Sequence, residues 1–221
     1  LAEQENSSID RSLSTLSSRV TYHFGASVYT HFPFGSYTRT TNLPRSMDSE
    51  SDVDYMVVFT DATLKPQTYL NRLRTFVEKY YSRSEIWQSS PTIVLNLGHI
   101  RFEVVAAINS SYGFQIPAPN KHYQEWMYTD PLGFRSRLDE INGRNSYKIK
   151  PMIRLLKYWN AQAKYPYSSF PLQEWAASLS FWNCTNLKDY FFKAIADLRV
   201  DYSSAQWIKD AVGRAQATVS K

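Results

Sequence analysis

The chain has 221 residues, 43% hydrophobic and 20% charged, which is the composition of a folded globular protein with one large domain or two small ones. Its net charge of +5 favours anionic partners such as nucleotides, and its single cysteine, Cys184, excludes a disulfide within the chain. Four histidines without a CxxC pair argue against structural zinc, and no run of 18 apolar residues predicts a membrane span. The polar start at residues 1–5 does not resemble a signal peptide, so we expect a cytoplasmic protein.

The first half of the chain predicts a mixed sheet with flanking helices. Helical spacing of apolar residues predicts helices over 6–26 and 66–82. Runs rich in β-branched and aromatic residues predict strands over 31–36, 53–59, 92–97 and 100–108. The run at 53–59 is predicted to be a central strand, and the tight turn at Leu97-Gly98-His99 predicts that the last two strands form a hairpin. Polar or Pro-, Gly- and Ser-rich connections are predicted over 37–51 and 109–121.

The second half is mostly helical from Asp130 onward. Its predicted helices cover residues 146–163, 170–183, 187–198 and 204–219. We therefore expect an α+β fold, with a mixed-sheet domain in residues 1–120 and a helical lobe in 121–221. A site in the cleft between two such halves is the ordinary expectation.

A Gly-Ser pair, Gly35-Ser36, stands at the end of the first predicted strand. Glycine lacks a Cβ, so the backbone can approach a phosphate closely, and serine adds a hydroxyl donor. Gly-Ser is also common in ordinary turns, so the pair indicates a function only in context.

Two carboxylates, Asp52 and Asp54, stand at the head of the central strand. The period of a strand places them on one face. Like charges side by side are unfavourable unless a cation lies between them, and oxygen ligands that also face a phosphate suit Mg²⁺. The alternative is a polar strand entry that faces water.

A lone acid, Glu103, lies inside the otherwise apolar strand 100–108. Two interpretations are open. Arg101 stands two residues earlier on the same face, so the pair can be a simple ion pair within the strand. Alternatively, Glu103 is a third metal-binding carboxylate that reaches the site from a neighbouring strand.

Together these features resemble the signature of polymerase-β-type nucleotidyltransferases: Gly-Ser, a fifteen-residue loop, Asp-x-Asp on a strand and one acid on a later strand. A narrower resemblance is carried by Gly35-Ser36-Tyr37-Thr38-Arg39-Thr40-Thr41 followed by Ser51-Asp52-Val53-Asp54, by Ile153-Arg154-Leu155-Leu156-Lys157-Tyr158-Trp159-Asn160, and by the segment from Trp207 to Ala217. These segments are similar to motifs of bacterial cyclic-oligonucleotide synthases of the CD-NTase (SMODS) class, relatives of cyclic GMP–AMP synthase in anti-phage signalling. The resemblance spans about residues 30–215 and implies a polymerase-β-like nucleotidyltransferase core in 1–120, with a helical lobe in 121–221 that closes the active-site cleft.

The resemblance also implies roles for the acids. Asp52, Asp54 and Glu103 are expected to bind two Mg²⁺ ions, with Mn²⁺ as a substitute. Glu103 is further expected to help deprotonate the acceptor hydroxyl. Gly35 and Ser36 are expected to hold the triphosphate of ATP or another NTP.

The helical half supplies the other expected nucleotide contacts. Lys150, Arg154 and Lys157 form a basic stripe at helical spacing, and the resemblance places Lys157 on the phosphates. A solvated basic face is the alternative.

Ser169 and Phe170 come just before Pro171 at a predicted helix start, where anions bind readily. The resemblance assigns them to the phosphates and the base, with Ser168 and Tyr167 as equal rivals. Ordinary helix capping is the alternative.

Two arginines, Arg39 and Arg45, lie in the loop before the acids. They either contact a second nucleotide or are solvated.

The expected reaction is magnesium-dependent transfer that makes a cyclic di- or trinucleotide second messenger in bacterial antiviral (CBASS-type) defence. Two alternatives remain: a nucleotidyltransferase that modifies a polymer end, a protein or a small molecule, and a catalytically inactive nucleotide-binding module. Without a long Lys/Arg run or a zinc-ligand cluster, no strong nucleic-acid binding is expected. No membrane contact is expected, and a regulatory protein partner would be of unknown kind.

Overall fold

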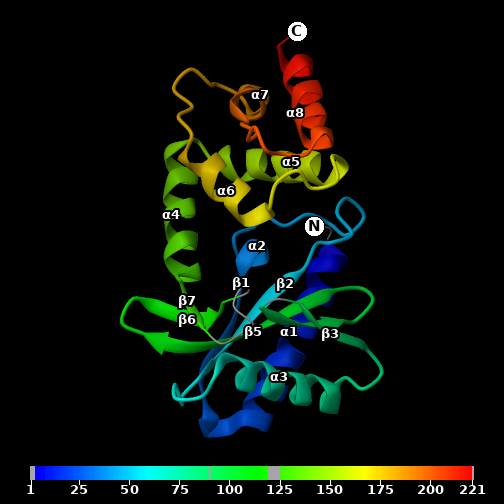
Figure 1. Ribbon diagram of the computed structural model, residues 1–221, viewed down its shortest axis with the longest axis vertical. Coiled ribbons are helices and arrows are strands. Elements are labelled where there is room, and N and C mark those ends of the chain that lie inside the picture. Colours follow the sequence, from blue (N-terminus) through cyan, green and yellow to red (C-terminus); the bar gives the residue numbers. More distant parts are fainter. Residues whose placement is uncertain (1–2, 90, 119–124, 221) are drawn as a thin grey trace. The chain divides into compact units, whose positions relative to one another are not determined.

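The computed structural model describes residues 3–89, 91–118 and 125–220 (Figure 1). The chain divides into two compact units. The first, which we call the sheet unit, contains Leu1–Pro44 and Glu50–Arg135. The second, which we call the helical unit, contains Arg45–Ser49 and Ser136–Lys221. The expected boundary at 120/121 lies outside the described residues, and the sheet unit continues beyond it to Arg135.

One mixed sheet organises the sheet unit. Within the described residues its strands are β1 (Val28–Phe34), β2 (Val53–Phe59), β3 (Glu85–Ser89), β4 (Thr92–Asn96), β5 (Arg101–Ser110), β6 (Gly113–Pro117) and β7 (Trp126–Thr129). The strand order is β1-β2-β5-β4-β3, with β6 paired to β5 and β7 paired to β6. Only β2 and β5 among these pairs run parallel. The predicted mixed sheet and the β4–β5 hairpin are therefore confirmed, while β2, predicted as a central strand, lies between β1 and β5, and β5 is the middle strand.

Several strand predictions were wrong or incomplete. Strands β3 and β7 were missed, and β6 occupies part of the predicted connection 109–121. In β3 half-buried and exposed residues alternate, and β6 and β7 are only five and four residues long, so their apolar pattern is weak. The first strand begins and ends earlier than predicted, because Gly35 already starts the one-turn helix α2 (Gly35–Thr38).

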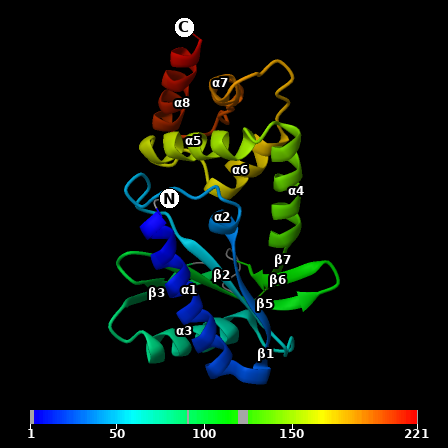
Figure 2. The same ribbon diagram turned by 180° about the vertical axis from the view of Figure 1, so that it is seen from behind.

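The main core lies on one face of the sheet, under the helices α1 (Glu3–Phe24) and α3 (Pro66–Tyr80). Figure 2 shows α1 running across this face. Alternate residues of β2 (Val53, Tyr55 and Val57) point into the core. Met56 and Val58 instead join a smaller cluster with Phe32, Phe34, Ala107 and Phe114 on the opposite face. The acids, which alternate with the core residues, belong to that opposite face.

The helical unit confirms the predicted helical second half. Its helices are α4 (Pro131–Arg144, which begins in the sheet unit), α5 (Ile149–Gln162), α6 (Ser169–Ser178), α7 (Leu187–Asp197) and α8 (Gln206–Val219). Helix α5 packs against α6 and α7, and α7 packs against α8. Helix α6 ends at Ser178, before the predicted residue 183, because Leu179 adopts an extended backbone. In the sheet unit, the short 3₁₀ turn η1 (Gly25–Ser27) lies between α1 and β1.

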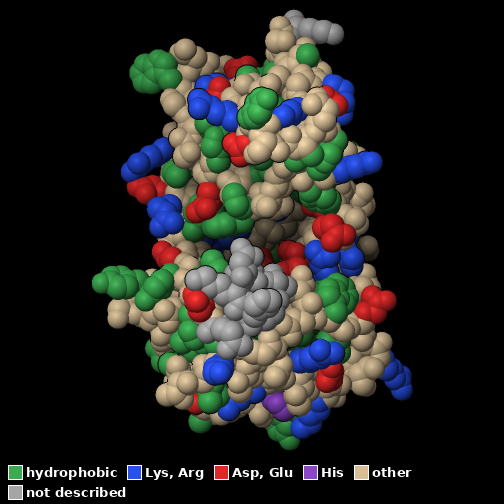
Figure 3. All heavy atoms as spheres, viewed as in Figure 1, with side chains coloured by type: hydrophobic (Ala, Val, Ile, Leu, Met, Phe, Trp, Pro, Cys, Tyr) green, Lys and Arg blue, Asp and Glu red, His purple; other side chains and the backbone are tan. Residues whose placement is uncertain are grey.

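Two surface properties bear on function. None of the helices in the described part of the chain combines the length and the apolar character that a bilayer crossing needs. On the face drawn in Figure 3, the basic side chains of the described residues are interspersed with acidic ones.

Candidate active site

The first two acids lie where β2 begins. Asp52 immediately precedes the strand, and Asp54 is its second residue. Val53 and Tyr55, which flank Asp54, are each 1% exposed and are anchored in the main core. Because neighbouring residues of a strand point in opposite directions, this anchoring turns Asp54 toward the face that α1 and α3 do not cover.

The third acid reaches the same place from β5. Parallel pairing of β2 and β5 sets Asp54 directly opposite Glu103. Burial and, next, the negative charge of Asp52 raise the pKa of Glu103 to about 7, while the charge of Arg101 opposes this rise. A side-chain hydrogen bond with Asp52 also raises it. The acids that are 51 positions apart in the chain are thus electrostatically coupled.

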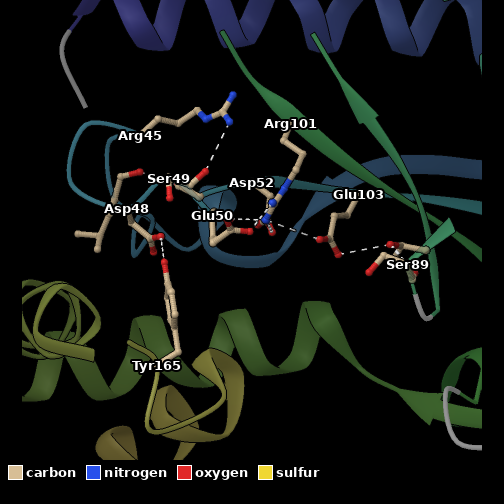
Figure 4. A network of polar contacts seen from close by, with 12 residues as sticks. Arg45, Asp48, Ser49, Glu50, Asp52, Ser89, Arg101, Glu103 and Tyr165 are labelled. Atoms are coloured by element: carbon tan, nitrogen blue, oxygen red, sulfur yellow. Dashed lines mark hydrogen bonds and ion pairs between the residues drawn. The ribbon is translucent and has the colours of Figure 1, made fainter. Parts of the chain in front are cut away.

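Arg101 lies at the centre of this acidic group (Figure 4). Its guanidinium nitrogens lie 2.6 Å from Glu50 Oε2 and 3.3 Å from Asp52 Oδ2. A third carboxylate, that of Glu103, lies 3.9 Å away. The predicted ion pair within the strand therefore exists but is the longest of three. Burial opposes the charge of Arg101, yet hydrogen bonds and ion pairs with Glu50 and Asp52 raise its pKa.

Sequence reasoning considered Arg101 only as a partner of Glu103 and did not consider Glu50. The signal for Arg101 was available, since a strand period puts it on the face of Glu103. Nothing in the sequence indicated Glu50, because its contact with Arg101 joins positions 51 residues apart.

The glycine of the Gly-Ser pair is required by its neighbour Asp54. Gly35 has a φ of +73°, a conformation that L side chains rarely adopt. A Cβ at this position would lie 2.6 Å from Asp54 Cγ and closer still to Oδ2. The space that glycine leaves open is therefore taken by the Asp54 carboxylate, whereas sequence analysis assigned it to a phosphate. The next residue, Ser36, is buried and begins the α2 turn.

Of the two interpretations of Arg39, the solvated side chain is wrong. Arg39 is 5% exposed, and its guanidinium lies 5.2 Å from the centre of the Phe134 ring. Such cation–π packing gives the side chain a structural role inside the sheet unit. Arg45 belongs to the helical unit, where its guanidinium donates to the Ser49 carbonyl at 3.5 Å.

Among the described residues, no three His, Cys, Asp or Glu side chains are grouped closely enough to form a ready metal site. In the present arrangement Arg101 supplies the positive charge beside Asp52 and Glu103. The donor set nevertheless fits a hard cation chemically, because it consists of carboxylates and because burial and a neighbouring like charge raise the pKa of one of them.

The remaining predicted nucleotide contacts belong to the helical unit. Lys157 is half-buried on α5, while Ser169 and Phe170 are exposed at the start of α6. Ser168 stands at the cap position but makes no side-chain capping hydrogen bond, so ordinary capping does not explain this serine. In the basic stripe, Lys150 pairs with Asp139 at 2.5 Å.

Solved structures share this fold. The CdnE cyclic dinucleotide synthase of Elizabethkingia meningoseptica, determined with GTP and Apcpp, matches with a TM-score of 0.70 at 17% identity, over 95% of this chain and 90% of that one. The Vibrio cholerae DncV cyclic AMP-GMP synthase, determined with a linear intermediate, matches with a TM-score of 0.69 at 11% identity, over 86% and 62%. The fold is thus that of the polymerase-β-like nucleotidyltransferases.

The sequence identifies the family more narrowly. Residues 1–142 match the model of the Second Messenger Oligonucleotide or Dinucleotide Synthetase (SMODS) domain, and the chain belongs to this family. A cyclic AMP-AMP-AMP synthase from Acinetobacter sp. is 26% identical over 142 residues. That match covers 61% of this chain and only 40% of the relative.

Proposed function

We propose that this protein is a magnesium-dependent nucleotidyltransferase that joins NTPs into a cyclic di- or trinucleotide second messenger. The observation that carries the proposal is the pairing of Asp54 with Glu103 on parallel strands, with Asp52 coupled to Glu103. Membership of the SMODS family supports it.

The three carboxylates are the proposed metal ligands. Divalent cations held by Asp52, Asp54 and Glu103 would lower the pKa of the attacking hydroxyl and neutralise charge on the phosphoryl oxygens. Two Mg²⁺ ions suit a set of oxygen donors that also faces a triphosphate, and Mn²⁺ would substitute.

The other roles in nucleotidyl transfer are assigned to residues of the chain. The hydroxyl oxygen of one nucleotide attacks the α-phosphorus of another, a new P–O bond forms, and the bond to pyrophosphate breaks. Glu103 accepts the hydroxyl proton as the general base. Ser36 and the backbone at Gly35 bind the triphosphate. Further rounds of the same chemistry extend the linear product, and the last one, within the linear di- or trinucleotide, closes the ring.

The helical unit is proposed to supply the outer nucleotide contacts. The Lys157 ammonium would pair with phosphate oxygens as a point charge. Ser169 lies at the N-terminus of α6, where backbone N–H groups favour anions, and Phe170 is 46% exposed and available to stack on a base. The substrates are ATP and other NTPs, and the reaction takes place in the cytoplasm.

Product analysis tests the reaction. Incubation with labelled NTPs and Mg²⁺ should yield phosphatase-resistant cyclic products identifiable by mass spectrometry. Asp52→Asn with Asp54→Asn should abolish them, whereas Asp61→Asn, a change of an exposed acid just beyond the other end of β2, should not. Full activity in the double variant would refute the metal site.

The same assay separates the alternatives. Linear or acceptor-linked label would favour a transferase that modifies a polymer end, a protein or a small molecule. Nucleotide binding without any product would favour an inactive module. A role in antiviral (CBASS-type) defence, with a regulatory protein partner, is part of the proposal and predicts that phage resistance is lost with the same double variant. Salt-sensitive DNA binding would contradict the expectation of weak nucleic-acid affinity.

A further inference from the structure

The loop over residues 44–50 leads from the Gly-Ser segment to the first acid, and its tip belongs to the other compact unit. Residues Arg45–Ser49 cluster with the helical unit, although the chain up to Pro44 and from Glu50 clusters with the sheet unit. Asp48 and Asp52 are separated by four positions, so at most about 14 Å of extended chain joins them. Asp48 and Asp52 are therefore joined by a short tether.

A hydrogen bond holds the tip of this loop. The Tyr165 hydroxyl donates to Asp48 Oδ1 at 2.5 Å, across 117 positions of the chain. Figure 4 shows the Tyr165 ring directed end-on at the Asp48 carboxylate. Asp48 is only 7% exposed, and a buried carboxylate requires hydrogen-bond donors, so the loop tip depends on such contacts.

The turn that carries Tyr165 is itself rigidly held. Lys164 and Tyr165 both have left-handed backbone conformations, with φ of 63° and 58°. The side-chain amide of Asn160, which is 1% exposed, donates to the Tyr167 carbonyl at 2.9 Å and accepts from the Tyr167 N–H at 3.1 Å. The Tyr165 N–H donates to the Asn160 carbonyl at 2.8 Å. Strained backbone that is maintained in this way is frequent at functional sites.

The base of the loop is held on the sheet unit. The Ser51 hydroxyl donates to the Leu43 carbonyl at 2.6 Å and closes the loop one residue before Asp52. On the same side, Arg101 holds the Glu50 carboxylate at 2.6 Å. Both the base and the tip of the loop are therefore anchored, and Asp52 directly follows the base.

We propose that Tyr165 and Asp48 are positioning residues for nucleotidyl transfer. Their hydrogen bond fixes the tip of the loop and thereby limits the orientations of Asp52. The inference rests on the proposed function, but neither residue has to touch a substrate. It assigns Tyr165 and Asp48 a role that is separate from nucleotide binding.

Kinetics of conservative variants test the inference. Tyr165→Phe removes only the hydroxyl, Asp48→Ala removes the acceptor, and Asp48→Asn keeps an acceptor oxygen. We expect kcat to fall about tenfold in Tyr165→Phe and Asp48→Ala, with KM for NTP changed less than about twofold, because a misplaced ligand slows chemistry rather than binding. Asp48→Asn should remain close to the wild type.

Two comparisons make this result specific. The double variant Tyr165→Phe/Asp48→Ala should be no slower than Asp48→Ala alone, because both substitutions remove the same hydrogen bond. Tyr147→Phe is the matched control, since Tyr147 is another tyrosine with left-handed backbone, φ 59°, and is 72% exposed. Unchanged kcat in Tyr165→Phe, additive losses, or an equal loss in Tyr147→Phe would overturn the inference.

Hydrogen exchange provides a readout that does not need activity. Without nucleotide, the amides of residues 44–52 should exchange faster in Tyr165→Phe than in the wild type. Equal exchange would overturn the inference whatever reaction the protein catalyses. Failure of the wild type to form any nucleotide product would instead overturn the proposed function and leave the exchange comparison interpretable.

Discussion

Replacement of Gly35 by alanine tests the close approach of the α2 turn to Asp54. Its φ of +73° is unfavourable for alanine by about 1–2 kcal/mol. The new Cβ would also lie 2.6 Å from Cγ and 2.9 Å from Cβ of Asp54, and contacts below 3.0 Å are essentially never seen for real Cβ atoms. The substitution therefore adds a steric clash to a backbone cost.

The clash cannot be relieved by a side-chain rotation alone. The Cβ of Asp54 is among the atoms that are too close, and this Cβ is fixed by the pairing of Asp54 with Phe34 on β1 and with Glu103 on β5. Either the carboxylate moves together with its strand or the turn at Gly35 moves away. A displacement of about 1 Å in a catalytic group lowers a rate by roughly 100-fold.

Gly98→Ala provides the matched control. Gly98 has a φ of +80°, close to that of Gly35, but nothing lies within 4 Å of the Cβ that alanine would add. Gly98→Ala should lose about 1–2 kcal/mol in urea unfolding, and Gly35→Ala should lose more, because its clash with Asp54 adds to the same backbone cost. In the nucleotide-product assay at saturating NTP and Mg²⁺, Gly98→Ala should keep the wild-type rate, while Gly35→Ala should lose about 100-fold. Equal rates for the two variants would refute the view that the space beside Gly35 positions Asp54.

Three other substitutions test particular contacts. The pKa of Glu103 is raised from 4.5 to about 7, so the folded state favours the protonated carboxyl. In the metal-free wild type, the free energy of unfolding should therefore be highest below pH 4.5 and should fall by about 3 kcal/mol as the pH rises through 7. With a chelator present, Glu103→Gln should therefore melt higher than the wild type at pH 8 and not at pH 5; equal melting at pH 8 would contradict the shift. Asn160→Ala should lower stability by about 1–3 kcal/mol in thermal melts, because it leaves the Tyr167 backbone groups without their partner; an unchanged melt would show that the amide is dispensable. Phe102→Ala, at a fully buried site, should cost about 3–5 kcal/mol in urea unfolding, against less than about 0.5 kcal/mol for Tyr112→Ala at an 83% exposed site; similar losses would contradict the burial argument.

Much of the site was predictable from local pattern. The apolar run 53–59 predicted β2 with its bounds, and the alternation along it predicted that Asp52 and Asp54 avoid the core face. Glu103 stood out because an acid in an apolar strand needs a partner. These inferences succeed because strand periodicity depends only on neighbouring residues.

The failures share a different cause. Arg39 looked like a solvated loop arginine, yet it packs on Phe134, 95 positions away. Arg101 looked like a partner of Glu103 alone, yet Glu50 and Asp52 are its closer partners. No local pattern records such contacts, because the two sides of each contact are brought together only by the fold.

The sequence by itself determined the class of fold, the family resemblance and the identity of the acids. Only the tertiary structure decided that Glu103 stands in register with Asp54, that the carboxylate of Asp54 fills the space beside Gly35, and that the loop tip 45–49 belongs to the helical unit. The physical reason is that periodicity and turn chemistry act between residues a few positions apart, whereas register, close approach and burial are decided by packing between segments that are distant in the chain.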